Sequence, residues 1–137
     1  MVKKRILSIA LAMLLLMSVV PAFAAQSDED TSVYSRGVKS VDATISLSGK
    51  TISCSGDASV VSGNYHLTLT MTLQKKNGKA WNPIDTWTAS GKTSASINKS
   101  KAGLSSGTYR CAVVARAYDK NDTLIEAVTA YSSTKTI

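Results

Sequence analysis

Two cysteines are the residues for which the sequence most directly suggests a chemistry. Cys54 and Cys111 are the only cysteines in the chain, and an even number in an oxidising compartment indicates a disulfide. Such a bond would close a long loop and stabilise the fold by roughly 4 kcal/mol through lost chain entropy. Two free, buried thiols are the alternative. A zinc site is not expected, because it needs three or four ligands and only His66 could join the cysteines.

The residues that could catalyse a reaction are few and scattered. His66, the only histidine, belongs to an alternating segment that places it beside threonines rather than in an apolar core, and no serine lies in the G-x-S-x-G pattern of hydrolases. The carboxylates fall in predicted turns and edges: Asp57, Asp85, Asp119, Asp122 and Glu126. Asp119 and Asp122 flank one turn, but two carboxylates make a poor calcium site and are common turn residues. We therefore expect no enzyme, no metal and no cofactor, with a hydrolase as a remote alternative.

Aromatic and basic side chains give the best indication of a binding surface. The candidate residues are Trp81, Trp87, Tyr65, Lys75, Lys76 and Lys79. Exposed aromatic rings would supply a large contact area for sugars or partner proteins at a small entropic cost, and the lysines would attract an anionic polymer. Both features also have simpler explanations, because tryptophans pack in cores and lysines on an edge strand prevent unwanted strand pairing.

The first 24 residues have the layout of a secretory signal peptide. The basic segment Lys3-Lys4-Arg5 precedes an apolar run over residues 6–20, and Ala22-Phe23-Ala24 forms a cleavage site. The apolar run is short for the alternative, a membrane anchor, which needs about 20 residues. We expect cleavage near Ala24-Ala25, secretion, and no membrane association of the mature chain.

The mature chain is moderately basic. The full sequence carries 16 basic and 9 acidic residues, a net charge of +7, and loss of the three basic residues of the leader leaves about +4. A charge of this size keeps a small domain soluble and would favour polyanions such as wall polymers. Nucleic acid is not expected as a partner, since the basic residues are spread over several turns and the location is extracellular.

Hydrophobic alternation predicts an all-β domain over residues 40–137, after a flexible polar tail over residues 25–39. Seven strands are expected, at 41–47, 51–56, 65–74, 81–89, 93–97, 108–118 and 123–133. Loops are expected at 57–64 and 98–103, and a hairpin turn at 75–79. Pro83 favours an edge position for its strand, and the mixed parity of the last strand favours a bulge or burial on both faces. Turns every 8–12 residues are typical of a sandwich.

Two motifs resemble those of immunoglobulin domains. Thr51-Ile52-Ser53-Cys54-Ser55-Gly56 is similar to the second strand, and Ser106-Gly107-Thr108-Tyr109-Arg110-Cys111 is similar to the sixth strand with its tyrosine corner. The resemblance implies an antiparallel immunoglobulin-like or fibronectin-III-like sandwich with a disulfide between the sheets. It also implies a hydrogen bond from the Tyr109 hydroxyl to backbone near Leu104, with Gly107 in the same corner.

The mature chain also resembles a group of small secreted proteins of Gram-positive gut bacteria. The shared features are Leu73-Gln74-Lys75-Lys76, a Trp-x5-Trp segment, Ser-Ser-Gly-Thr-Tyr-Arg and a final Tyr-Ser-Ser-Thr. That group implies a location and a fold but no activity. We expect a secreted, non-enzymatic binding or adhesion-type module at or near the bacterial surface. Its partner would be a cell-wall polymer, a glycan or a surface protein, and the alternative is a structural protein that associates with itself through edge strands.

Overall fold

Residues 36–137 are described by the computed structural model. They form an all-β domain with eight strands. The strands are β1 (Val38–Ser48), β2 (Thr51–Val60), β3 (His66–Asn77), β4 (Ala80–Gly91), β5 (Ser94–Lys101), β6 (Thr108–Tyr118), β7 (Leu124–Tyr131) and β8 (Lys135–Thr136). The predicted signal peptide (residues 1–24) and most of the predicted tail lie outside the described residues.

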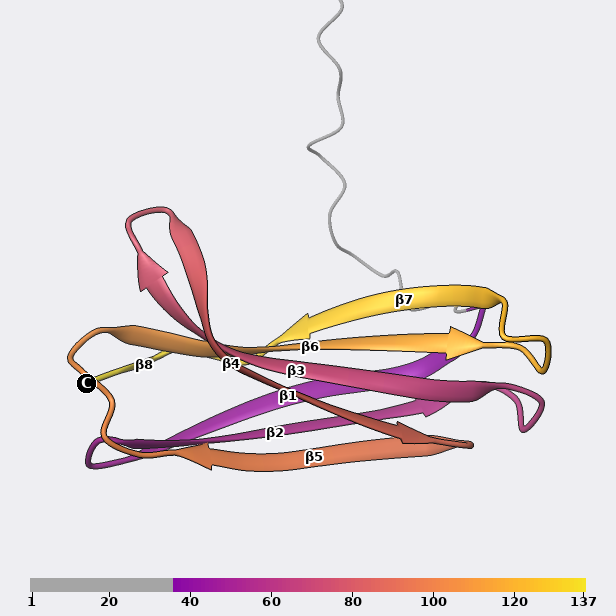
Figure 1. The fold of residues 1–137 in the computed structure, drawn as a ribbon, viewed down its shortest axis with the longest axis horizontal. Helices are drawn as coiled ribbons and strands as arrows, with labels where there is room; N and C mark the ends of the chain where they lie inside the picture. The colour runs from indigo at the N-terminus through magenta and orange to yellow at the C-terminus, as the bar shows by residue number, and fades with distance from the viewer. Residues whose placement is uncertain (1–35) are drawn as a thin grey trace, which may run out of the picture. The chain divides into compact units, whose positions relative to one another are not determined.

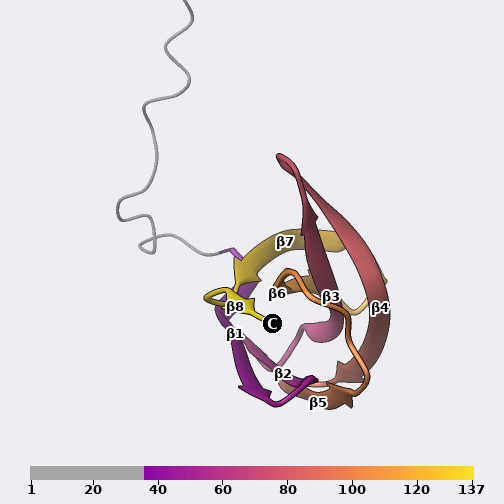
Figure 2. The ribbon, with the colours of Figure 1, turned by 90° about the vertical axis from the view of Figure 1, so that its left-hand side faces the viewer.

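The strands form two antiparallel sheets that pack face to face (Figure 1). One sheet has the order β1-β2-β5, and the other has the order β4-β3-β6-β7, with β8 paired to the start of β6. Seen along the strands, the two layers enclose a single core (Figure 2). The predicted immunoglobulin-like sandwich is confirmed, and the short β8 is added because the last residues pair with Thr108 and Tyr109.

Alternation of side chains builds the core. In β3, Leu67, Leu69, Met71 and Leu73 are fully buried, while the threonines between them are only half-buried. β6 repeats this pattern, with Tyr109, Cys111, Val113, Ala115 and Ala117 facing inward. Because β3 and β6 pair in the middle of the five-stranded sheet, these two inward rows form most of its contribution to the core.

The two sheets are joined covalently by the Cys54–Cys111 disulfide. Cys54 lies in β2 and Cys111 in β6, with Cα atoms 6.1 Å apart, and both are buried. The prediction of one inter-sheet disulfide is therefore confirmed, and the alternative of two free thiols is wrong.

A tyrosine corner precedes the disulfide on β6. The Tyr109 hydroxyl donates to the Ser105 carbonyl at 2.7 Å, and the Tyr109 ring is 1% exposed. Leu104 is buried beneath the corner. Gly107 has a φ of 154°, a conformation that favours glycine because it lacks a Cβ. The corner motif thus holds the first residues of β6 in place.

Several strands are longer than the sequence predicts. β2 continues to Val60, so the first half of the loop expected at 57–64 is strand, because Ala58 and Val60 also turn into the core. β5 continues to Lys101, so the prediction of a loop at 98–103 is wrong over residues 98–101. Residues 98–101 are polar, but they pair with residues 52–55 through backbone groups, which do not depend on side-chain polarity.

The β3–β4 hairpin extends beyond the sandwich. Its loop is only Gly78-Lys79, with Gly78 at a φ of 64°, so residues 75–77 belong to β3 and not to the turn expected at 75–79. A register shift at Leu73/Gln74 leaves Ile84 as an extra residue in β4. Bulges increase local twist, and beyond this point residues 74–85, which we call the projecting hairpin, rise away from the sheet (Figures 1 and 2). As Pro83 predicts, β4 is an edge strand.

β7 contains the bulge that its mixed parity favours. Its register with β6 shifts between Ala117 and Tyr118, so Ile125 is the extra residue. Next to it, the Glu126 carboxylate accepts hydrogen bonds from the backbone amides of Gly37 at 3.1 Å and Val38 at 2.9 Å. These bonds fasten the start of β1 to β7. β1 therefore begins at Val38, two residues before the predicted start of the domain at residue 40.

The pKa of Glu126 is lowered from its ordinary value of 4.5. Burial acts most strongly and would raise the pKa, but it is outweighed by the combined effect of backbone hydrogen bonds from Val38, Gly37 and Arg36 and the charge of Arg36. The ionised carboxylate is thus the form that the fold favours.

Removal of the disulfide tests its contribution to stability. It closes a separation of 57 residues, so the double variant Cys54→Ala/Cys111→Ala should lose about 4 kcal/mol of unfolding free energy. Urea unfolding followed by circular dichroism measures the loss. An unchanged unfolding midpoint would contradict the prediction.

Glu126 should make stability depend on pH in a defined direction. Because its folded-state pKa is below the unfolded value, its stabilisation is present above the ordinary pKa of 4.5 and is lost as pH falls through the folded pKa. Glu126→Gln should lower stability at pH 7 by about 1 kcal/mol and flatten the decline below pH 5. Asp42→Asn, at an exposed position of β1, is the control. Equal pH profiles for wild type and Glu126→Gln would show that the carboxylate does not fasten β1.

Candidate binding site

Three side chains meet on the outer face of the five-stranded sheet, the face turned away from the three-stranded sheet. The guanidinium carbon of Arg110 lies 4.2 Å from the centre of the Trp81 ring and 4.1 Å from the centre of the Tyr131 ring. Arg110 Nε also donates to Gln74 Oε1 at 2.8 Å. We call Trp81, Arg110 and Tyr131 the arginine stack. Each contact between a cation and a ring contributes about 0.5–2 kcal/mol, depending on desolvation.

Register and the bulge bring the stack together. Arg110 in β6 lies opposite Gln74 in β3, and Tyr131 in β7 lies opposite Ala112, two residues further along the same face of β6. Trp81 comes from the other side, from β4, where it is paired with Lys76 beyond the bulge. The twist of the projecting hairpin allows the indole to reach across β3 to the guanidinium.

Arg110 is the most firmly positioned member of the stack. It stands between Tyr109, which is fixed by its bond to Ser105, and Cys111, which is fixed by the disulfide. The neighbour of Tyr131 is fixed as well, because the Ser132 hydroxyl accepts from the Cys111 amide at 2.8 Å and the Ser132 amide donates to the Cys111 carbonyl at 2.9 Å. Arg110 and Tyr131 therefore lie on well-restrained strands, the arrangement that precise recognition needs.

The guanidinium retains free hydrogen-bonding capacity. A guanidinium has five N–H donors, and Gln74 takes only the one at Nε. Within residues 36–137 no carboxylate forms an ion pair with Arg110. Two rings cover its faces, so the terminal nitrogens at its edge are the part left for a ligand. Such an edge matches a carboxylate or phosphate in a bidentate manner.

A cleft of about 300 Å³ lies against the projecting hairpin. It is lined by Lys75, Lys76, Asn77, Asn82 and Ile84. Its volume is at the lower end of the range for small-molecule sites, and its lining is basic and polar apart from Ile84. The projecting hairpin therefore carries a positively charged cleft in addition to Trp81 of the arginine stack.

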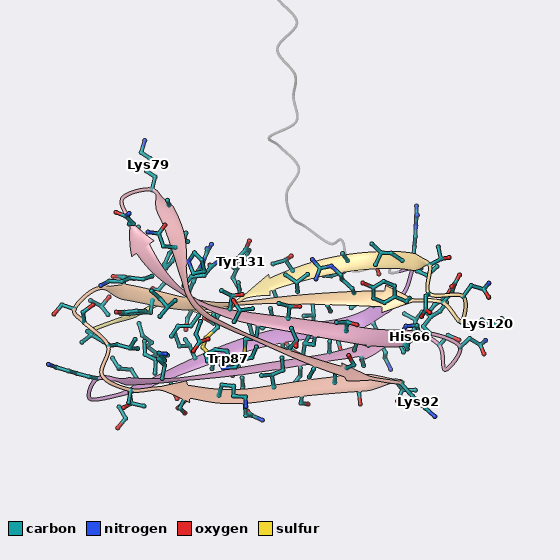
Figure 3. The ribbon with its side chains drawn as sticks, viewed as in Figure 1. His66, Lys79, Trp87, Lys92, Lys120 and Tyr131 are labelled. Atoms are coloured by element: carbon teal, nitrogen blue, oxygen red, sulfur yellow. A yellow bond between two sulfur atoms is a disulfide. The ribbon has the colours of Figure 1, made fainter. Side chains whose placement is uncertain are left out.

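The structure does not bring the six predicted platform residues onto one surface. Trp87 and Tyr65 pack against the core, and Trp87 lies between the two layers in Figure 3. Lys75 donates to Ser105 Oγ at 2.6 Å and lies over the Tyr109 ring at 5.6 Å, so it supports the tyrosine corner. Of the six, Trp81, Lys76 and Lys79 lie on the hairpin without supporting the corner, and Lys79 is at the hairpin tip (Figure 3).

The alternation of side chains along β4 explains why Trp81 and Trp87 lie on opposite faces of the sheet. Trp87 pairs with the buried Met71, whereas Trp81 pairs with Lys76 on the other side of the bulge, and the inserted Ile84 reverses the parity between the two tryptophans. Sequence reasoning did not identify Arg110, Tyr131 or Gln74 as site residues. The available signal was the outward parity of Arg110 between two buried neighbours.

The residues that a hydrolase or a metal site would use have local roles. The His66 ring stacks on Tyr118 with centroids 5.4 Å apart, and its Nε2 lies 3.1 Å from Asp122 Oδ1. The Asp119 carboxylate accepts from the amides of Asn121 and Thr123 and so shapes the β6–β7 turn. In the described part of the chain, no three metal-ligating side chains are grouped together. None of the described residues forms a helix long and apolar enough to cross a membrane.

The two tryptophans should differ in their effect on stability. Trp87→Ala should cost about 3 kcal/mol, because it removes a ring packed on the core. Trp81→Ala should cost about 1 kcal/mol, because it removes mainly the contact with Arg110. Urea unfolding of both variants measures the difference. A loss for Trp81→Ala as large as that for Trp87→Ala would show that the indole of Trp81 is part of the core.

A search of family models, of curated proteins and of solved structures finds no match to this chain.

Proposed function

We propose that this protein is a secreted, non-enzymatic binding module that acts at or near the bacterial surface. Its ligand site would be the arginine stack together with Lys76 and Lys79 of the projecting hairpin. The observation that carries the proposal is the Arg110 guanidinium, held between two aromatic rings with its edge free for a ligand.

Secretion is supported by the leader and by the disulfide. The basic, apolar and small-residue segments of residues 1–24 have the order of a signal peptide. A buried disulfide between the sheets fits an oxidising compartment, since such bonds are rare in the cytosol. A resemblance to small secreted proteins of Gram-positive gut bacteria supports the same location.

The chemistry of the site favours an extracellular polymer as the ligand. Aromatic rings provide apolar area with little loss of entropy, and an arginine edge recognises anionic groups. Lys76 and Lys79 are exposed and add positive charge, and the acidic residue of the same hairpin, Asp85, is already paired with Lys101 at 3.2 Å. A cell-wall polymer combines both features, and an anionic glycan or a surface protein with acidic side chains would share them.

Self-association through edge strands is the less well supported alternative. β4 is an exposed edge of its sheet, but Pro83 and the register shift beside it interrupt a regular row of hydrogen-bonding groups. Sedimentation velocity over a concentration series tests this alternative, and a monomer at every concentration would remove it.

Binding to purified bacterial walls is the direct test. Residues 25–137 should sediment with walls at low salt, and high salt should weaken this binding, because screening reduces the contribution of Arg110 and the lysines. Trp81→Ala should reduce the sedimented fraction several-fold while the protein stays folded. Lys92→Ala is the control, since Lys92 is an exposed lysine far from the hairpin (Figure 3).

Absence of sedimentation at either salt concentration would overturn the assignment to the wall. Sedimentation that Trp81→Ala does not change would show that the protein binds walls through another surface.

A further inference from the structure

The outer face of the five-stranded sheet continues beyond the arginine stack to a second arginine. Arg116 lies six residues along β6 from Arg110, on the same outward parity. At about 3.4 Å per residue the two positions are roughly 20 Å apart. Like Arg110, Arg116 forms no ion pair with any residue in the range 36–137. The face therefore has two cations on one straight line along a strand.

Short, mostly hydroxylated side chains cover the sheet between the two arginines. Across β6 they are Ala112 and Val114, and the paired positions on β3 and β4 are Thr72, Thr70, Thr86 and Thr88. Thr129 of β7 lies opposite Val114 and is exposed. Since these side chains are small, a ligand lying along the strands between the arginines meets no obstruction, and threonine hydroxyls can hydrogen-bond to it.

Acidic groups are absent from this face in the described part of the chain. Asp42 and Asp57 are cross-strand neighbours on the three-stranded sheet. Asp85 forms an ion pair with Lys101, and the Glu126 carboxylate accepts a hydrogen bond from the start of β1. The nearest acidic residue is in the turn after β6. There Asp122 contacts His66, which pairs with Tyr118, two residues beyond Arg116. The potential of the face is thus positive from the hairpin to Arg116 and ends at a carboxylate.

We propose that the ligand is a linear polysaccharide bearing carboxylate groups, which lies along β3 and β6 from the arginine stack to Arg116. This inference rests on the proposed function and specifies its ligand. Charge complementarity requires anionic groups at both ends of the face, and the rings of Trp81 and Tyr131 beside Arg110 favour a ligand with a sugar ring next to the first carboxylate. The hydroxyls between the arginines fit the hydroxylated sugars that would connect the two anionic groups.

A series of uronic-acid oligomers of increasing length tests this arrangement. Isothermal titration calorimetry with oligogalacturonates should show an increase in affinity of about tenfold or more once the oligomer spans both arginines, because a second charge-assisted contact is gained. Arg116→Gln should remove this increase and leave the affinity for short oligomers unchanged. Arg110→Gln should weaken binding at every length. Lys50→Gln is the control, because it removes the same charge from an exposed position in the β1–β2 turn of the opposite sheet, and it should change nothing.

The outcomes separate this inference from the proposed function. Equal affinity for all lengths, or an Arg116→Gln variant identical to wild type, would overturn the extended ligand while leaving binding at the stack intact. Binding to a polyol phosphate but not to oligogalacturonate would overturn the carboxylate assignment. Wall binding that persists in Trp81→Ala and Arg110→Gln would overturn the proposed site itself, and the extended ligand with it.

Discussion

The position of β6 is the constraint on which the rest of the domain depends. The disulfide at Cys111 connects this strand to the opposite sheet, and the Tyr109 hydroxyl fixes its start to the loop before it. Arg110 lies between these two anchors, so its backbone has little freedom to move. Because the inward residues of β6 are held by the core, its outward residues are held in register too. The same strand therefore supplies both the stability of the sandwich and the cation of the proposed site.

The projecting hairpin is held in a different way. Beyond Lys75, which pairs with Tyr109, β3 has no further partner in β6, so the outer part of the hairpin, residues 76–84, is held by pairing between its own two strands and by the contact of Trp81 with Arg110. A fixed arginine is thus combined with an aromatic arm that has fewer restraints. Preorganised charge limits the entropy lost on binding, while the less restrained hairpin can adjust to the shape of a ligand. This division of roles fits recognition of a repeating polymer better than recognition of one rigid small molecule.

Local patterns predict much of this fold because burial and sequence period are directly linked. The alternation of Leu67, Leu69 and Met71 identifies β3, and the Leu104-to-Cys111 motif identifies the corner and the disulfide strand. The longer β5 could not be predicted, because residues 98–101 are held by backbone pairing and their side chains do not alternate in polarity, whereas Ala58 and Val60 continue the alternation of β2 and were a signal for its greater length. The site was missed for a related reason. One inserted residue, Ile84, separates Trp81 from Trp87 in parity, and only the folded sheet places Trp81 beside Arg110.

The two outer faces of the sandwich differ in how much of their hydrogen-bonding capacity is already used. On the three-stranded sheet, Ser40 bonds to Ser59 at 2.8 Å and Ser53 bonds to Ser100 at 2.7 Å. Other polar side chains on that sheet form similar pairs, Ser96 with Asp57 and Ser55 with Asn98. A ligand there would have to replace bonds between neighbouring side chains, which reduces the net gain. On the five-stranded sheet, the threonines between the arginines have one such pair among residues 36–137, Thr72 with Thr86, and no carboxylate in that range forms an ion pair with either arginine. Greater free capacity and uncompensated positive charge occur on the same face, and this combination makes the five-stranded sheet the surface on which an anionic glycan would be bound.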